Sequence, residues 1–223
     1  MIKKEKVRHG FILCFLTFMV LISGISYAES QEETYDWHTL KVKYDKFLME
    51  QSEENKLELL NILPQKSVKP TYNEVLSDIF LKNFKPLENL AQKGDLLAIK
   101  ILFRFRLLTD GAMSEWINIV IGRSITSNPT NFLIALEENM DRYTRIYHFL
   151  GALGDDYVDK PQKQADALLE RYLAINSVET DKYSDISLYT KYLCLNILSG
   201  QISQSTTLLF MMDDKTEMLD YTK

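Results

Sequence analysis

The sequence predicts an all-α domain, and three observations support this fold class. After residue 35, apolar residues recur at intervals of three and four positions through nearly the whole chain, which is the period of an amphipathic helix. No stretch of useful length alternates strictly between apolar and polar residues, as a half-buried strand would. Helix start and stop signals flank many of the periodic segments. We therefore expect helices and no sheet.

The first 28 residues have the three-part layout of a secretory signal peptide. Residues 1–10 are basic, residues 11–25 are almost wholly apolar, and the segment ending at Ala28 places small residues at the two positions that a signal peptidase reads. We expect cleavage after Ala28 and a single mature domain, residues 29–223, in a bacterial periplasm or outside the cell. A retained membrane anchor is the alternative, although 15 apolar residues are fewer than the roughly 20 of a spanning helix.

Removal of this leader makes the chain more acidic. The full sequence carries 26 basic and 31 acidic residues, and the leader holds four of the basic residues and one of the acidic ones, so the mature chain has a formal net charge of −8. Such a chain repels phosphate backbones and anionic lipid head groups. We expect no nucleic-acid partner. The sequence after residue 28 contains no apolar run of spanning length.

Apolar stripes mark the helices in chain order. The members of each stripe follow the helical pattern i, i+3, i+4, i+7, i+8 or part of it, and so share one face of a helix. The stripes are Trp37, Leu40, Tyr44, Phe47 and Leu48; Tyr72, Val75, Leu76, Ile79 and Phe80; Tyr143, Ile146, Tyr147 and Leu150; Ala165, Leu168, Leu169, Tyr172 and Leu173; and Ile186, Tyr189, Leu193 and Ile197. We expect eight to ten antiparallel helices of about 9–16 residues with short loops, arranged as an αα-superhelix or a compact irregular bundle.

Capping signals agree with this division. Thr71 and Glu74 form a capping box. Asn128 and Lys160 each precede a proline, which is tolerated at the first position of a helix. Several glycines stand where a periodic run ends, and we expect them to be left-handed residues that follow a helix. They are Gly94, Gly111, Gly122, Gly151 and Gly200.

Residues 96–108 predict a central helix, because only Lys100, Arg104 and Arg106 interrupt an otherwise apolar segment. A helix without a polar face is packed on several sides. The following segment, residues 117–121, is rich in β-branched residues and admits a short strand as the alternative to a helix. Its helical surroundings favour the helix.

The segment 87–98 resembles the corner of a HEAT- or Sel1-type helical hairpin. In such corners a glycine ends the first helix and an aspartate begins the second, and Gly94 and Asp95 stand in that order here. The resemblance covers residues 87–116 and carries no family assignment. What it implies is a helical-repeat-like arrangement in this part of the chain.

Four charged residues near the end of the central helix are the candidate binding residues: Arg104, Arg106, Asp110 and Glu115. A buried guanidinium needs a carboxylate or a route to solvent, and Arg106 and Asp110 stand at i, i+4, where they can pair. One interpretation is an internal ion pair; the other is a groove that binds an anionic group. Asp110 and Glu115 also permit a two-carboxylate hydrolase site, provided that they face each other across a cleft.

Cysteine and histidine usage predicts no metal and no cofactor. Cys194 alone remains after cleavage of the leader, so it is either buried or joined to another chain. His38 and His148 are not spaced as metal ligands, and Asp155, Asp156 and Asp159 do not follow the pattern of a calcium loop. The apolar segment 208–212 either docks on the domain or forms a contact patch.

We therefore expect an exported helical protein that acts by binding a protein or peptide partner in the cell envelope. A periplasmic immunity or inhibitor protein is one specific form of this function. The alternative from another class is an exported, glycan-directed hydrolase with an unrecognised carboxylate site. The sequence leaves the oligomeric state open, and it contains no nucleophile elbow, phosphate loop or dinucleotide motif.

Overall fold

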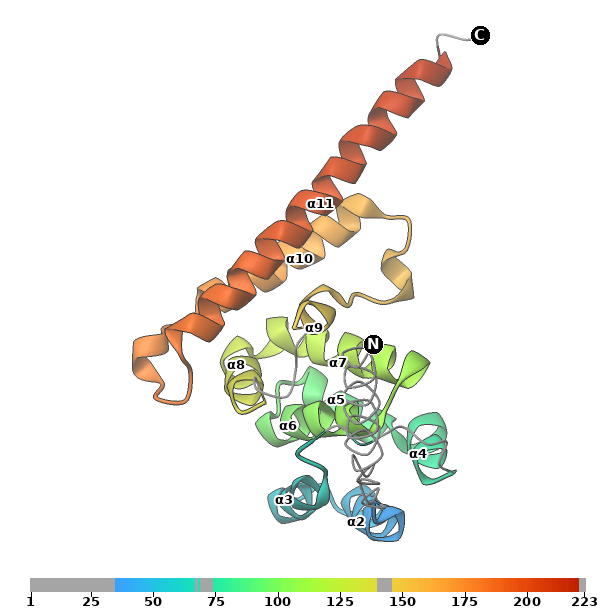
Figure 1. Cartoon of the computed structure of the whole chain (residues 1–223), viewed down its shortest axis with the longest axis vertical. Helices are drawn as coiled ribbons and strands as arrows, with labels where there is room; N and C mark the ends of the chain where they lie inside the picture. The colour runs from blue at the N-terminus through green and yellow to red at the C-terminus, as the bar shows by residue number, and fades with distance from the viewer. Residues whose placement is uncertain (1–34, 67, 69–73, 140–145, 221–223) are drawn as a thin grey trace, which may run out of the picture. The chain divides into compact units, whose positions relative to one another are not determined.

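The structure is a computed structural model that describes residues 35–66, 68, 74–139 and 146–220, the last of these with side chains up to residue 207. All regular structure in these residues is helical (Figure 1), which confirms the all-α prediction. The α-helices are α2 (Trp37–Met49), α3 (Glu53–Ile62), α4 (Glu74–Asp78), α5 (Lys85–Gln92), α6 (Leu96–Phe105), α7 (Gly111–Ser127), α8 (Pro129–Glu137), α9 (Tyr147–Gly151), α10 (Pro161–Asn176) and α11 (Leu188–Asp220). A π-helix, η1 (Ile79–Asn83), and the 3₁₀ turns η2 (Arg106–Leu108), η4 (Asp155–Tyr157) and η5 (Thr180–Lys182) complete the set.

The ten α-helices of the described residues belong to one unit, Asp36–Lys223, and form a compact irregular helical bundle. Their number agrees with the prediction, whereas their lengths range more widely, from 5 residues in α4 and α9 to 33 in α11. None of the helices in the described part of the chain is long and apolar enough to cross a bilayer. The leader, Thr71, Tyr72, Tyr143 and the side chains of 208–212 lie outside the described residues.

Helix α6 is the centre of the bundle, as its all-round apolar sequence predicts. It packs against α3, α5, α7 and α8 (Figure 1). Its fully buried side chains are Ala98, Ile99, Ile101, Leu102, Phe103 and Phe105. Burial of a large apolar side chain contributes about 1.5–3 kcal/mol, so this helix supplies much of the driving force for folding.

An aromatic cluster joins the N-terminal helices to α6. Tyr44 of α2 lies edge-on to Phe105, with ring centroids 5.8 Å apart, and Phe80 of η1 meets the same ring at 5.8 Å. The Tyr44 hydroxyl donates to the Asn83 carbonyl at the end of the π-helix (3.1 Å). This bond satisfies the carbonyl of the last residue of the π-helix. Burial also raises the pKa of Tyr44 well above its ordinary value.

The corner between α5 and α6 has the geometry that the sequence indicates. Gly94 has φ +79°, and its N–H donates to the Ala91 carbonyl (2.9 Å), so it closes α5 as a left-handed residue. Asp95 then caps α6, because its Oδ1 accepts from the Ala98 N–H (2.8 Å). The same aspartate accepts from Lys56 Nζ of α3 at 2.5 Å.

The expectation for the other glycines is wrong at three positions. Gly122 lies inside α7, Gly151 is the last residue of α9, and Gly200 lies inside α11, and none of the three has a positive φ. Gly111 does have one, +49°, but it begins α7 rather than following a helix. Gly122 and Gly200 therefore do not mark helix ends, and at Gly122 close packing against Phe149 and Arg171 accounts for the glycine.

The proline signals after Asn128 and Lys160 are confirmed. Asn128 Oδ1 accepts from the Asn131 N–H (3.0 Å), with Pro129 as the first residue of α8. Pro161 likewise begins α10. The ambiguous segment 117–121 is helical and lies within α7.

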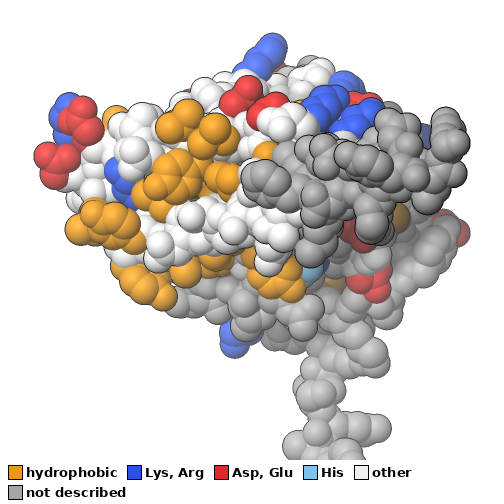
Figure 2. All heavy atoms as spheres, turned by 90° about the horizontal axis from the view of Figure 1, so that it is seen from above, with side chains coloured by type: hydrophobic (Ala, Val, Ile, Leu, Met, Phe, Trp, Pro, Cys, Tyr) orange, Lys and Arg blue, Asp and Glu red, His pale blue; other side chains and the backbone are white. Residues whose placement is uncertain are grey.

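Helices α10 and α11 pack along each other, side by side in Figure 1. Buried side chains between them and the neighbouring helices include Leu168, Ile175 and Cys194. On the outer side, exposed hydrophobic side chains gather over this pair of helices (Figure 2). Cys194 is a free, buried thiol, and desolvation raises its pKa to about 12. It is therefore a core residue, as one of the two sequence interpretations states.

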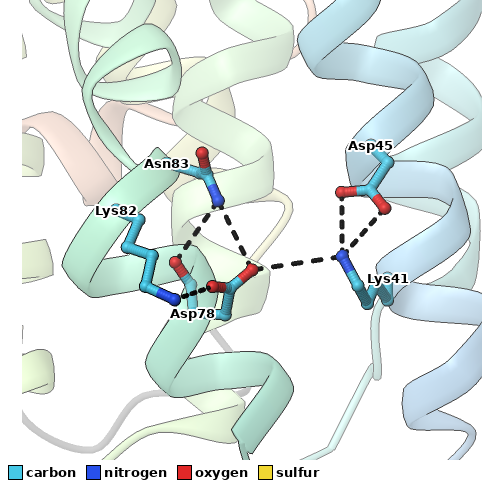
Figure 3. Close-up of polar contacts among 5 residues, drawn as sticks. All are labelled: Lys41, Asp45, Asp78, Lys82 and Asn83. Carbon is cyan, nitrogen blue, oxygen red and sulfur yellow. Dashed lines mark hydrogen bonds and ion pairs between the residues drawn. The ribbon is translucent and has the colours of Figure 1, made fainter.

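A surface network of charges ties α2 to α4 and η1 (Figure 3). Lys41 Nζ lies 2.9 Å from Asp45 Oδ2 and 4.0 Å from Asp78 Oδ2. Lys82 Nζ lies 2.8 Å from Asp78 Oδ1, and this bond lowers the pKa of Asp78. Because such exposed ion pairs contribute about 0–1 kcal/mol each, the network connects α2 with α4 and η1 but adds little to the free energy of unfolding.

Candidate binding site

Among the four charged residues selected from the sequence, Arg106 bonds to neighbouring polar groups, while Asp110 and Glu115 are exposed. Arg106 donates from Nε to Asn118 Oδ1 and from Nη1 to the Thr109 carbonyl, both at 3.2 Å. Asp110 and Glu115 are exposed, and the described ion pairs contain no bond between Arg106 and Asp110. The predicted i, i+4 ion pair is wrong, because polar groups next to Arg106 already satisfy it.

The remaining arginine of this set also has a local partner. Arg104 Nη1 donates to the Pro64 carbonyl (3.3 Å) and so holds the segment after α3. The exposed positions of Asp110 and Glu115 contrast with the facing, enclosed carboxylates that a glycan hydrolase uses. No group of His, Cys, Asp or Glu side chains in the described part of the chain is arranged to hold a metal ion.

A cavity that the sequence did not indicate lies among α9, η4, α10 and α11, and has a volume of about 370 Å³. This volume lies within the usual range for small-ligand sites, about 300–1,000 Å³. Its lining combines apolar side chains with amides, hydroxyls and glycine backbone: Gly151, Leu153, Gly154, Tyr157, Val158, Gln164, Leu168, Gln201, Gln204 and Ser205. We call this cavity the α9–α11 pocket.

Arg171 fixes the wall of the pocket formed by the loop after α9. This α10 residue is 4% exposed, and its two terminal nitrogens donate to the carbonyls of Leu150 (2.5 Å) and Ala152 (2.8 Å). Burial lowers the pKa of the guanidinium to about 10, which leaves it charged at neutral pH. The cation therefore caps the carbonyl end of α9, where the helix dipole favours positive charge.

Gly122 makes room for that cation. A Cβ atom at this position would lie 2.9 Å from each terminal nitrogen of Arg171 and 2.7 Å from the Phe149 carbonyl oxygen. The absence of a side chain in the middle of α7 thus lets α7, α9 and α10 meet around one guanidinium. The mid-helix glycine has a packing role, in contrast to the helix-ending role that its sequence position suggested.

Tyr157 forms another part of the pocket wall and is held from α10. Gln164 Nε2 donates to the Tyr157 carbonyl (2.7 Å), and Lys163 Nζ lies 4.5 Å from the centre of the tyrosine ring, within the distance of a cation–π contact. Gly154, with φ +95°, turns the chain into this segment. The aromatic wall is thereby placed beside Leu168, which is buried.

Gln201 of α11 presents the most informative polar group. Its Nε2 donates to the Tyr147 carbonyl (3.2 Å), whereas its Oε1 is buried without a hydrogen-bond partner among the described residues. The amide orientation follows from the carbonyl, which accepts and cannot donate. An unsatisfied buried acceptor costs about 1–3 kcal/mol, so a turn of this side chain that gave the oxygen an N–H partner would recover free energy.

The side chains that line the pocket are of the kinds that bind a ligand by hydrogen bonds and apolar contact. Three glutamine amides, a serine hydroxyl and a tyrosine line the pocket together with leucine and valine. The amides and hydroxyls supply uncharged donors and acceptors, and the apolar side chains supply a surface for a non-polar group. This combination is typical of sites that orient a neutral ligand through a few placed polar groups.

The sequence reasoning missed this pocket because its residues are far apart in the chain. Gln164 and Gln201 lie on separate helices, 37 positions apart. A partial signal was present: Gln201, Gln204 and Ser205 place polar groups on one face of α11, next to the apolar stripe of Leu193 and Ile197. The packing of α11 on both α9 and α10 brings that face to the loop after α9.

The chain matches no protein-family model, no curated protein and no solved structure. The α9–α11 pocket is therefore the basis for a functional inference.

Proposed function

We propose that the protein is an exported binding module and that the α9–α11 pocket takes a peptide segment of a protein partner in the cell envelope. The observation that carries this proposal is the pocket itself, which neutral polar and apolar side chains line, among them Gln201. A peptide supplies both complementary parts, since its backbone N–H donates to an amide oxygen and its side chain fills an apolar recess. Export rests on the charge and apolar pattern of residues 1–28.

Blocking the pocket tests the binding proposal. We expect Gln204→Trp, at an exposed rim position, to abolish recovery of the partner from an envelope fraction in a pull-down read by mass spectrometry. Gln51→Trp, an exposed position between α2 and α3, makes the same substitution away from the pocket and should retain the partner. Synthetic peptides that tile the recovered protein then identify the bound segment by isothermal titration calorimetry.

Two results would contradict pocket binding. One is equal recovery of every protein by Gln204→Trp and the unsubstituted chain. The other is a recovered protein of which no peptide binds with an affinity that Gln204→Trp reduces at least tenfold. Circular dichroism of both variants controls for folding.

Export makes a separate prediction about the N-terminus. Protein recovered from the periplasm or the medium should begin at or near Glu29, because Ala28 is the expected cleavage residue. Edman sequencing or intact-mass measurement checks this. An intact Met1 in a membrane fraction would instead support the retained anchor.

A further inference from the structure

One face of α11, opposite the core, is exposed and uncharged. Successive helix residues turn by about 100°, so the following six residues lie within one sector: Leu188, Tyr189, Tyr192, Asn196, Ser199 and Ser203. All six are exposed, and the large side chains are prominent, with 55% exposure for Leu188, 69% for Tyr189 and 55% for Tyr192. We call this surface the α11 face.

The neutrality of the α11 face extends along the helix. Between Ile186 and Thr207 the only charged residue in the sequence is Lys191. Its Nζ is turned to the end of α10, where it donates to the carbonyls of Asn176 (2.8 Å) and Val178 (2.7 Å). The exposed surface therefore carries no ionic group along about five turns of helix, in a chain whose formal net charge is −5.

We propose that a second copy of this chain docks on the α11 face, with the two α11 helices packed around a two-fold axis. Two copies of an acidic chain repel each other wherever their acidic surfaces meet. A neutral face avoids that repulsion, and a two-fold axis brings the same patch of each copy together. Tyrosine and leucine side chains then bury apolar area while the tyrosine hydroxyls stay at the wet rim.

The size of the α11 face sets the strength of the contact. The large side chains of this face are two tyrosines and a leucine, each between about half and two-thirds exposed. An interface built on three such side chains buries less than roughly 1,200 Å² of surface in total, which is the weak end of specific complexes. We therefore expect a dimer in the micromolar range whose dissociation depends little on salt, because no ion pair holds it.

Analytical ultracentrifugation of the protein as recovered from cells tests this dimer. The expected result is a concentration-dependent shift from monomer to dimer between about 5 µM and 1 mM. Tyr192→Glu places two like charges in the contact and should weaken association at least tenfold, and Tyr189→Glu should do the same. Val42→Glu on α2, a residue 51% exposed, changes the net charge equally and should leave the dimer intact.

Three results would overturn the dimer. The first is a monomer at all concentrations, and the second is a dimer that neither tyrosine substitution weakens. The third is loss of the dimer in Val42→Glu as well, because that loss would indicate an effect of net charge. Unchanged helical circular dichroism in each variant excludes unfolding as the cause, and the result is independent of whether the α9–α11 pocket binds a peptide.

Discussion

Gly94→Ala is expected to lower the free energy of unfolding by about 3 kcal/mol. Two costs contribute to this value. A φ of +79° is unfavourable for any residue with a Cβ, and the added methyl group would lie 2.3 Å from Asn128 Cβ at the start of α8. Because Gly94 O also accepts from Asn131 Nδ2 (2.8 Å), the corner has little freedom to move away. Urea unfolding followed by circular dichroism measures the change.

Two other glycines are matched controls for this substitution. Gly111 has φ +49°, and a Cβ there meets nothing within 4 Å, so Gly111→Ala should cost only the backbone strain, about 1 kcal/mol. Gly200 lies inside α11 with open space around it, and Gly200→Ala should stabilise the protein by about 0.5–1 kcal/mol. If Gly94→Ala and Gly111→Ala lower the free energy of unfolding equally, the contact with Asn128 contributes nothing to the cost at position 94.

Asp95→Ala is expected to lower the free energy of unfolding by about 3 kcal/mol, as much as Gly94→Ala. The Asp95 carboxylate caps α6 and pairs with Lys56 Nζ. The Lys56 side chain is only 6% exposed, so removal of its partner leaves a buried ammonium without compensation. Loss of the cap adds about 1 kcal/mol of that total.

Substitution of the lysine partner separates the cost of leaving a buried charge unpaired from the cost of losing the helix cap. Lys56→Met removes the charge together with its desolvation cost and should lose less than about 1.5 kcal/mol. In the double variant, Lys56→Met should recover a large part of what Asp95→Ala loses, because no unpaired ammonium then remains. Additive losses in this double-mutant cycle, measured by urea unfolding, would show that the buried ammonium carries no such penalty.

The elements that the sequence predicted correctly are those with local causes. Asp95 and Asn128 cap the helices that follow them, and a cap depends on three or four neighbouring residues. The apolar composition of residues 96–105 likewise indicates burial whatever the neighbours are. Local hydrogen bonds and periodicity therefore account for the helices, their order and the central position of α6.

The errors arose where a distant contact decided the outcome. Gly122 stands in the sequence like a helix end, yet it continues α7 where Phe149 and Arg171 pack closely against it. Arg106 has an acid one turn away in Asp110, yet it bonds to Asn118 of the next helix. The pocket, too, depends on the packing of α10 against α11 and the loop after α9, which no spacing within one segment can specify.

The buried guanidinium of Arg171 ties the wall of the α9–α11 pocket to the packing of three helices. It holds the carbonyls of Leu150 and Ala152 while packing on Gly122 of α7, so the pocket wall exists only when three helices are assembled. Under the proposed function, a ligand of the pocket would bind only the assembled native state and would stabilise it by about 2.7 kcal/mol at a hundredfold excess over Kd. The melting temperature of the domain would then report the occupancy of the pocket.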